Sequence, residues 1–415
     1  MLKHVCKILL NEWRSNLLIA IEMLLITLCS TYLVDHLVAQ FYQINRPMGC
    51  SIDNVGRIRI SKYPPESPDY IAGRDNDTLE NEAIQTILSR LEHHPAVEAI
   101  SISRNSLPHQ GNNNSNSLQL DTITVERALD RLVTPSFFRV FRIEGITGTR
   151  EELIEALEKR EIVACASLAQ AFRRTPETFF GAEVHLEQSG DSTSTTRVGG
   201  VCKPMRIDNF WYTWYSFFHY NPGLYKVLHQ YYNWFEFAIR LKDDAALSFQ
   251  DLLAELKPQL RADNFYVSEI QDLRDIRSRF QQSDYNALKL RMLYISFLGV
   301  CIFLGIVGTF WYRTQERRSQ IGLRLAVGGT PASTMKLFLL EGILILFSTL
   351  LFTLPAYYLG TAYRLLSMPW LVFPTRMLLV FVITYCIFGF LIILAIWLPC
   401  RNAVKISPAI AMHDE

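Results

Sequence analysis

Four long apolar stretches dominate the pattern of hydrophobic and polar positions along the chain. They are residues 17–34, 292–312, 337–363 and 377–400. Two of them contain no charged residue, and the other two contain a single glutamate each, Glu22 and Glu341. A helix that crosses a bilayer needs about 20 mostly apolar residues, and these stretches largely lack the polar stripe of a water-soluble helix. The pattern therefore predicts four transmembrane helices.

The region between the first two apolar stretches has a mixed pattern that is typical of an α+β domain. Strands are expected where polar and apolar positions alternate, and helices where apolar positions recur every three to four residues. The expected strands are 56–61, 96–103, 117–125, 161–167, 198–204, 235–241 and 264–270. The expected helices are 78–94, with Thr78 as N-cap, 150–160 and 248–260. Residues 272–290 also have helical spacing and predict one continuous helix into the second apolar stretch. The fold class is therefore an α-helical membrane protein with four transmembrane helices and a large α+β extracytoplasmic domain between helices 1 and 2.

The distribution of charge predicts the side of the membrane on which each part lies. The chain has 41 Lys and Arg residues and 40 Asp and Glu residues. Residues 40–289 hold 28 basic and 33 acidic residues, whereas the remainder holds 13 basic and 7 acidic ones. Because short loops rich in Lys and Arg stay on the cytoplasmic side, both termini are expected in the cytoplasm. We expect a multi-pass protein of the bacterial cytoplasmic (inner) membrane.

The segments follow from this topology. They are a cytoplasmic amphipathic N-terminal helix (1–16), transmembrane helix 1 (17–39), the periplasmic domain (40–289), transmembrane helix 2 (290–312), a cytoplasmic loop (313–336), transmembrane helix 3 (337–363), a short periplasmic loop (364–376), transmembrane helix 4 (377–400) and a cytoplasmic tail (401–415). The first span is expected to be an uncleaved signal anchor, since its apolar run is long and no small-residue cleavage site follows it.

Glu22 and Glu341 lie at matched depth in their spans, near the cytoplasmic side. A carboxylate at the centre of a spanning helix costs about 2.5–3.5 kcal/mol on insertion scales. The sequence shows no chain of such groups across the membrane, so a structural role at a helix contact or a snorkelling role is favoured over a proton relay. Asp35 and His36 are expected at the outer membrane interface, and Pro355 is expected to kink the third helix.

The sequence carries no pattern of a catalytic, metal or nucleotide site. No CxxC or His/Cys spacing indicates a metal, and no glycine precedes a lysine, which excludes a Walker A loop. We therefore expect no enzymatic activity and no cofactor on this chain, and no nucleic-acid partner. Cys165 and Cys202 fall in expected strands, where a disulfide and two buried thiols both stay open as interpretations.

Residues 210–237 are unusually aromatic, with 14 Phe, Trp or Tyr residues among 28. Too many of them are consecutive to face one core, so some are expected on a surface. Aromatic rings offer apolar area with a polar tip, which suits a hydrophobic peptide, a lipid or a protein subunit. The candidate substrate or partner surface comprises Trp211, Trp214, Phe217, Phe218 and Trp234. The alternative is an insertion that packs against its own domain or against a second protomer.

The loop 313–336, RTQERRSQIGLRLAVGGTPASTMK, holds five basic residues and one acid. Gly328-Gly329 predicts the end of one helical piece. Thr330-Pro331 predicts an N-cap followed by proline in the first turn of the next helix. A folded loop of this kind offers a surface to which a cytoplasmic partner can bind.

This loop resembles the signature of MacB/FtsX-type permeases of the type VII ABC transporter superfamily, R-x-x-E-I-G-L-R-x-A-x-G-A-[ST] followed by a span with an early acidic residue. The matching positions are Arg317, Ile321, Gly322, Leu323, Arg324, Ala326, Gly328, Thr330 and Glu341. Gln320 departs from the usual glutamate, and Leu325 from a common basic residue. Residues 134–149, 161–172, 197–206 and the tail resemble the family more loosely.

The resemblance implies a MacB-like periplasmic core domain, an FtsX-like permease domain, and a homo- or heterodimer bound to a separate ABC ATPase that carries ATP and Mg. It assigns ATPase coupling to the loop residues Arg317, Ile321, Gly322, Leu323, Arg324, Ala326, Gly328, Gly329 and Thr330. It also implies mechanotransmission, in which ATP-driven movement is passed to the periplasmic domain and, as a further candidate, to a periplasmic partner.

The substrate stays open from the sequence. Export or efflux of a peptide, drug or lipid-linked molecule, lipoprotein extraction and control of a cell-wall enzyme all fit the resemblance. The alternative function is a membrane-anchored sensor or scaffold, including FtsX-like regulation of a cell-wall enzyme.

Overall fold

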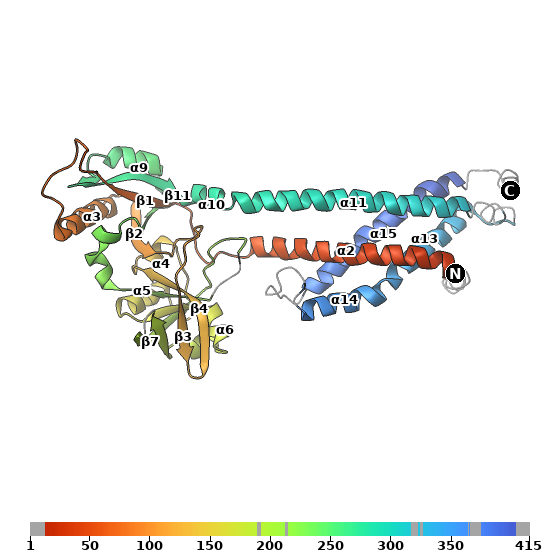
Figure 1. The fold of residues 1–415 in the computed structure, drawn as a ribbon, viewed down its shortest axis with the longest axis horizontal. Helices are drawn as coiled ribbons and strands as arrows, with labels where there is room; N and C mark the ends of the chain where they lie inside the picture. Colours follow the sequence, from red (N-terminus) through yellow and green to blue (C-terminus); the bar gives the residue numbers. More distant parts are fainter. Residues whose placement is uncertain are drawn as a thin grey trace. The chain divides into compact units, whose positions relative to one another are not determined.

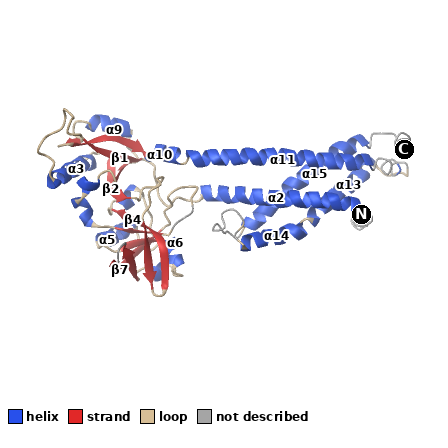
Figure 2. Cartoon of the chain, in the orientation of Figure 1, coloured by secondary structure: helices blue, strands red, loops and turns tan. Residues whose placement is uncertain are grey.

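The computed structural model describes residues 13–188, 192–211, 215–316, 323, 327–363, 365 and 375–403. The chain forms two compact units (Figures 1 and 2). The helical unit comprises residues 1–45 and 285–415, and the β-rich unit comprises residues 46–284. All described strands belong to the β-rich unit. The predicted amphipathic helix of residues 1–16 lies mostly outside the described residues.

The helical unit is formed by five described helices. They are α2 (Trp13–Asn45), α11 (Gln282–Glu316), α13 (Pro331–Ser348), α14 (Leu350–Ala362) and α15 (Arg376–Ala403). Four stretches in them are long and apolar enough to cross a membrane, namely Ile19–Asn45, Gln282–Thr309, Met335–Ala362 and Arg376–Trp397. These stretches correspond to the four apolar helices predicted from the sequence.

The helices of this unit pack around a shared apolar core. Ile19 and Met23 of α2, Ile306 of α11, and Val380 and Ile392 of α15 are almost fully buried there. Large apolar side chains on the opposite faces stay exposed, as expected for helices that are apolar on all sides and meet lipid.

The third span breaks between α13 and α14 at Thr349, six residues before Pro355. The Thr349 hydroxyl is within hydrogen-bond distance of the Leu346 carbonyl at 2.7 Å and of the Tyr385 hydroxyl at 2.9 Å. Threonine side-chain bonding accompanies this break. Pro355 itself lies inside α14, and the kink expected there stays a prediction.

The β-rich unit is built on one sheet of eleven strands. The strands are β1 (Val55–Lys62), β2 (Val97–Arg104), β3 (Ser115–Leu120), β4 (Ile123–Val133), β5 (Ile162–Cys165), β6 (Glu183–Gln188), β7 (Ser192–Cys202), β8 (Ser216–His219), β9 (Glu236–Leu241), β10 (Arg261–Ala262) and β11 (Phe265–Asp272). The strand order is β10-β11-β1-β9-β2-β4-β3-β6-β7-β5-β8.

Short helices connect and cover these strands. They are α3 (Asp77–Glu92), α4 (Phe137–Val140), α5 (Arg150–Glu158), α6 (Ala166–Ala171), α7 (Pro176–Phe179), the 3-10 helix η1 (Pro222–Lys226), α8 (Leu228–Tyr231), α9 (Phe249–Leu256) and α10 (Leu273–Phe280). α3 and α9 cover the part of the sheet around β1, β2, β9 and β11, where side chains such as Ile84, Leu252 and Phe237 form one core.

A second pairing closes half of the sheet on itself. β8 pairs in parallel with β4 as well as antiparallel with β5. Six strands, β4, β3, β6, β7, β5 and β8, therefore form a ring, whose interior contains Phe217, Val198 and Leu118. Closure leaves this half of the sheet without a free edge at β8.

Three sequence predictions need correction. The single strand expected at 117–125 is a hairpin of β3 and β4 that turns at Asp121, which has φ 54°. The N-cap of α3 is Asn76, whose side chain accepts from the Thr78 and Leu79 N–H groups, and not Thr78. The continuous helix expected over 272–312 is divided into α10 and α11.

Gln281 marks the division between α10 and α11. Its side chain is buried and its amide nitrogen donates to Asp208 Oδ1 at 2.5 Å and Asn209 Oδ1 at 2.9 Å. These bonds fix Gln281 to the loop after β7.

Candidate functional site

The predicted coupling loop is described only in part. Arg317, Ile321, Gly322, Arg324 and Ala326 lie outside the described residues. Leu323 is 57% exposed and Val327 is 81% exposed, and the Val327 N–H donates to the Leu323 carbonyl at 3.1 Å. The two side chains are four residues apart in one helical turn, so they share one face.

Local turn chemistry shapes the end of this loop. Gly328 has φ 94°, a left-handed conformation that suits glycine at a helix end. Thr330 is the N-cap of α13, since its hydroxyl accepts from the Ser333 N–H at 3.3 Å, and Pro331 stands in the first turn. Gly329 and Thr330 are exposed. This end of the loop is therefore a fixed, accessible turn directly before the third span.

The two intramembrane glutamates lie at helix contacts. Glu22 of α2 accepts a hydrogen bond from the Thr309 hydroxyl of α11 at 3.2 Å. A Cβ added at Gly305, one turn earlier on α11, would lie 3.8 Å from Glu22 Oε1, which is ordinary van der Waals contact, so Gly305 also faces α2. Glu341 of α13 is buried, with 1% exposure.

A buried ion pair in the helical unit was not anticipated from the sequence. Asp35 of α2 is fully buried, and Arg376, the first residue of α15, binds both of its oxygens at 2.8 and 2.7 Å. The Tyr357 hydroxyl of α14 donates to Asp35 Oδ1 at 2.9 Å. Asp35 and His36 were expected at the outer membrane interface; that position stays a prediction, and the helix contact of Asp35 was not part of it. Opposite charges at the predicted outer ends of spans 1 and 4 were the signal that could have revealed the pair.

The aromatic candidates separate into buried and exposed groups. Phe217 and Phe218 on β8 are fully buried, so their assignment to a surface was wrong: adjacent residues of a strand point to opposite faces, and both faces are covered here. Trp211 is 40% exposed and lies 6.1 Å from the Phe280 ring. Trp234 is 64% exposed. Trp214 lies outside the described residues.

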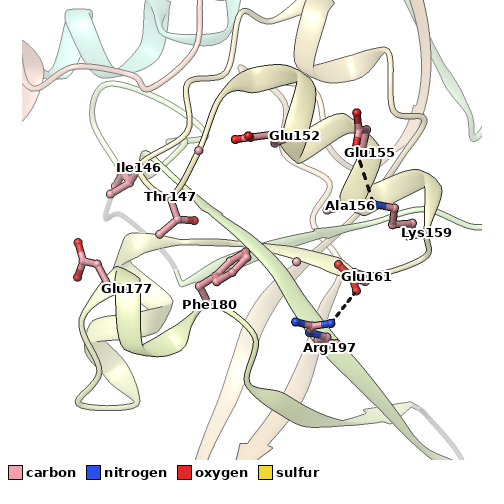
Figure 3. Close-up of a pocket in the computed structure, with 12 residues that line it drawn as sticks. Ile146, Thr147, Glu152, Glu155, Ala156, Lys159, Glu161, Glu177, Phe180 and Arg197 are labelled. Atoms are coloured by element: carbon pink, nitrogen blue, oxygen red, sulfur yellow. Dashed lines mark ion pairs between the residues drawn. The ribbon is translucent and has the colours of Figure 1, made fainter.

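A hollow of about 760 Å³ lies beside α5 in the β-rich unit. Its lining includes four glutamates and two cations, and Figure 3 shows the ion pairs Glu155–Lys159 and Glu161–Arg197, at 3.7 and 3.8 Å. Its described lining residues are Ile146, Thr147, Gly148, Glu152, Glu155, Ala156, Lys159, Glu161, Glu177, Phe180, Arg197 and Gly199. None of these described lining residues is Ser, Cys or His.

Glycines explain how α5 packs beside this hollow. A Cβ added at Gly200 would lie 2.2 Å from Leu153 Cδ2, and one at Gly199 would lie 2.6 Å from Ala156 Cβ. The Gly-Gly pair of β7 therefore permits the close approach of α5 to the sheet.

Cys165 and Cys202 are direct partners on β5 and β7. Their sulfurs are 3.6 Å apart and both thiols are free and buried, so the structure shows two thiols and no disulfide. The Ser216 hydroxyl donates to Cys165 Sγ at 3.0 Å. Hydrogen bonding from Cys202 lowers the pKa of Cys165. No group of three or more metal-binding side chains occurs among the described residues.

Comparison with known proteins gives the class of the helical unit. Residues 292–408 match the family model "FtsX-like permease C-terminal". No curated protein sequence matches the chain.

Two solved structures are similar to part of the chain. One is a domain of a protein described as a permease, from Porphyromonas gingivalis, with 15% identity over 53% of this chain and 91% of that chain and a TM-score of 0.34. The other is the periplasmic region of MacB from Actinobacillus actinomycetemcomitans, with 13% identity over 57% of this chain and 97% of that chain and a TM-score of 0.32. Neither TM-score reaches 0.5, so neither match supports a conclusion about function.

Four apolar helices and the family match together define a multi-pass membrane protein with a permease domain. Residues 292–408 belong to the FtsX-like permease family, and the resemblance predicted from the sequence is confirmed over this part of the chain.

Proposed function

We propose that this chain is the permease subunit of an ABC transporter whose ATPase is a separate protein. The observation that carries the proposal is the match of residues 292–408 to the FtsX-like permease C-terminal family. The chain lacks a Walker A loop, so ATP and Mg belong to the partner ATPase. In this proposal the partner drives movement of the β-rich unit by mechanotransmission.

The proposed topology places both termini and residues 313–336 in the cytoplasm of a bacterium, and the β-rich unit in the periplasm. The distribution of charge supports it, since the basic residues outside 40–289 concentrate at the two ends and in this loop. We propose a homo- or heterodimer that exports a peptide, drug or lipid-linked substrate.

The turn before α13 supports a role in coupling. Leu323 and Val327 expose apolar side chains on one helical face, and the Thr330 cap fixes the start of the span that follows. An exposed apolar helical face fits a groove on a partner protein. Movement of such a partner would be passed directly to α13.

The test is co-purification of the full chain from its host, followed by ATP hydrolysis of the complex in nanodiscs. An ATPase subunit is expected to co-purify, and Gly329→Val, deletion of 316–330, or Leu323→Asp with Val327→Asp is expected to abolish stimulated hydrolysis without preventing membrane insertion. Gly111→Val is the control for valine substitution, since Gly111 lies in the β-rich unit outside the left-handed region and a Cβ added there would meet no atom within 4 Å.

Two results would overturn the proposal. Normal stimulated hydrolysis in the loop variants would remove the coupling role. Absence of any co-purifying ATPase would favour the membrane-anchored sensor or scaffold.

A further inference from the structure

Two adjoining hollows meet at Trp234 on the β-rich unit. The polar hollow has a volume of about 610 Å³, and the apolar hollow has a volume of about 560 Å³. Both are lined by Arg104, Trp234 and Phe235. Each volume lies in the range of about 300–1,000 Å³ that is common for ligand sites. We call the two hollows together the Trp234 groove.

The polar hollow holds uncompensated positive charge. Arg57 and Arg104 both line it, and neither guanidinium has a hydrogen bond or ion pair within the described part of the chain. Arg59, two residues from Arg57 on the same strand, shows the contrast, because it pairs with Glu269 at 3.0 Å. Two unpaired guanidinium groups beside one hollow favour an anionic ligand.

The single carboxylate of the polar hollow is already occupied. Glu236 is 4% exposed, and its Oε2 accepts from the Ser103 hydroxyl at 2.8 Å and from the Ser106 and Leu107 N–H groups at 3.0 Å. Gln110 donates to its Oε1. Glu236 therefore folds the loop that follows β2 and makes no ion pair with Arg57 or Arg104 in the described part of the chain. Two cations and one carboxylate line the hollow, which leaves a net positive charge.

The same loop is fixed from a second side. The buried Arg131 donates through Nη1 to the Ser106 carbonyl at 2.8 Å. The loop carries Asn105, Asn112 and Asn113 to the hollow, where Asn233 joins them. Each amide side chain offers both a donor and an acceptor, which matches the N–H and C=O groups of a peptide.

The apolar hollow supplies an anchor. Leu132, Leu224, Val227 and Phe235 line it with aliphatic and aromatic surface. Tyr231 and Trp234 are 45% and 64% exposed, and their rings are 6.0 Å apart. Exposed aromatic side chains beside a pocket are frequent binding hot spots.

We propose that the Trp234 groove binds a short peptide that carries a carboxylate next to a bulky apolar side chain. The carboxylate lies between Arg57 and Arg104, the apolar side chain enters the apolar hollow against Trp234, and the asparagine amides bond the peptide backbone. An acyl-chain amphiphile would leave these amides unused, and a sugar would leave the aliphatic lining without a partner. The assignment concerns the β-rich unit alone and does not depend on an ATPase.

The experiment selects ligands with the full chain in nanodiscs. A display library of random eight-residue peptides is panned on the wild-type protein, with counter-selection on Trp234→Ala. The expected result is enrichment of Asp or Glu beside Phe, Leu, Ile or Trp. The dissociation constant of one selected peptide is then compared with that of the same peptide carrying Asn or Gln in place of the acid.

Variants separate the two parts of the groove. Arg57→Gln with Arg104→Gln is expected to weaken the acidic peptide roughly tenfold to a hundredfold, as for loss of charged hydrogen bonds, and to leave the amide peptide nearly unchanged. Trp234→Ala is expected to weaken both peptides. Arg174→Gln is the matched control, because Arg174 is an exposed arginine paired with Asp121 elsewhere on the same unit. Unchanged thermal unfolding of each variant shows that it is folded.

Three outcomes would overturn the proposal. The first is no enrichment, or enrichment without acidic residues. The second is equal binding of the acidic and amide peptides. The third is that no peptide binds, whereas N-lauroylglycine binds saturably. That result would assign the groove to an acyl amphiphile.

Discussion

Replacing Arg376 by alanine removes one half of the buried ion pair that joins α15 to α2. Arg376 binds both oxygens of Asp35, at 2.8 and 2.7 Å, and Asp35 has no exposed surface. After the substitution the carboxylate keeps the Tyr357 hydroxyl but loses its bidentate cation. Breaking a buried pair in this way costs about 3–5 kcal/mol, because the remaining charge stays buried after its counter-ion is removed.

The loss of stability in Arg376→Ala depends on the Asp35 carboxylate that stays charged and buried, and not on the net strength of the ion pair. A variant with both charges removed, Asp35→Asn with Arg376→Gln, keeps an acceptor for Tyr357 and leaves no ion at this site. Since neutral replacement of a buried pair is often close to neutral in stability, this double variant is expected to recover most of the stability that Arg376→Ala loses.

The assay is unfolding of the full chain in mixed detergent micelles with increasing SDS, followed by circular dichroism. Arg291→Ala is the control, since Arg291 is an exposed arginine that contacts His36 at 3.3 Å in the same unit, and it is expected to cost less than about 1 kcal/mol. A loss below about 1 kcal/mol for Arg376→Ala, or a double variant no more stable than Arg376→Ala, would refute the reasoning.

Three further predictions concern the β-rich unit. Gly200→Ala places a Cβ 2.2 Å from Leu153 Cδ2 and is expected to cost about 1–3 kcal/mol in denaturant unfolding; no loss would contradict the close packing of α5. Phe218→Ala empties a fully buried site and is expected to cost about 3–5 kcal/mol, whereas Trp234→Ala is expected to change the free energy of unfolding by less than about 0.5 kcal/mol; equal losses would contradict the burial pattern. Burial lowers the pKa of His109 to about 4. Between pH 6.5 and 4 this histidine is therefore protonated in the unfolded chain and neutral in the folded chain. Stability is therefore expected to fall by about 3 kcal/mol between pH 6.5 and 4 through this group, and the fall is expected to be smaller in His109→Gln; identical pH profiles for the two proteins would remove His109 as the cause.

Composition and local turn chemistry predicted the parts of the structure that depend on few residues. Long runs with at most one charged residue identify the four apolar helices, and the Thr330-Pro331 start of α13 follows from the preferences of an N-cap and a first turn. Alternation in GRIRIS similarly predicted β1.

Contacts between distant residues were the features that the sequence did not reveal. The closure of the ring depends on pairing of Leu129 with Ser216, and local periodicity carries no information about such a partner. Asp35 and Arg376 are more than 300 residues apart, and each alone resembles an ordinary charge at the end of a span. Phe217 and Phe218 were assigned to a surface because the sequence of one strand does not show that other elements cover both of its faces.

The order of strand pairing has a consequence for the sequence of events during synthesis. β1 emerges first from the β-rich unit, but its partners are β9 and β11, whose residues follow it by about 180 to 210 positions. The ring between them uses only strands from Ser115 to His219. Since pairing of distant segments is slow and must wait for the later partner, the ring is expected to fold first as an inserted module. β1 is then expected to stay unpaired on both edges until β9 and β11 have been synthesised.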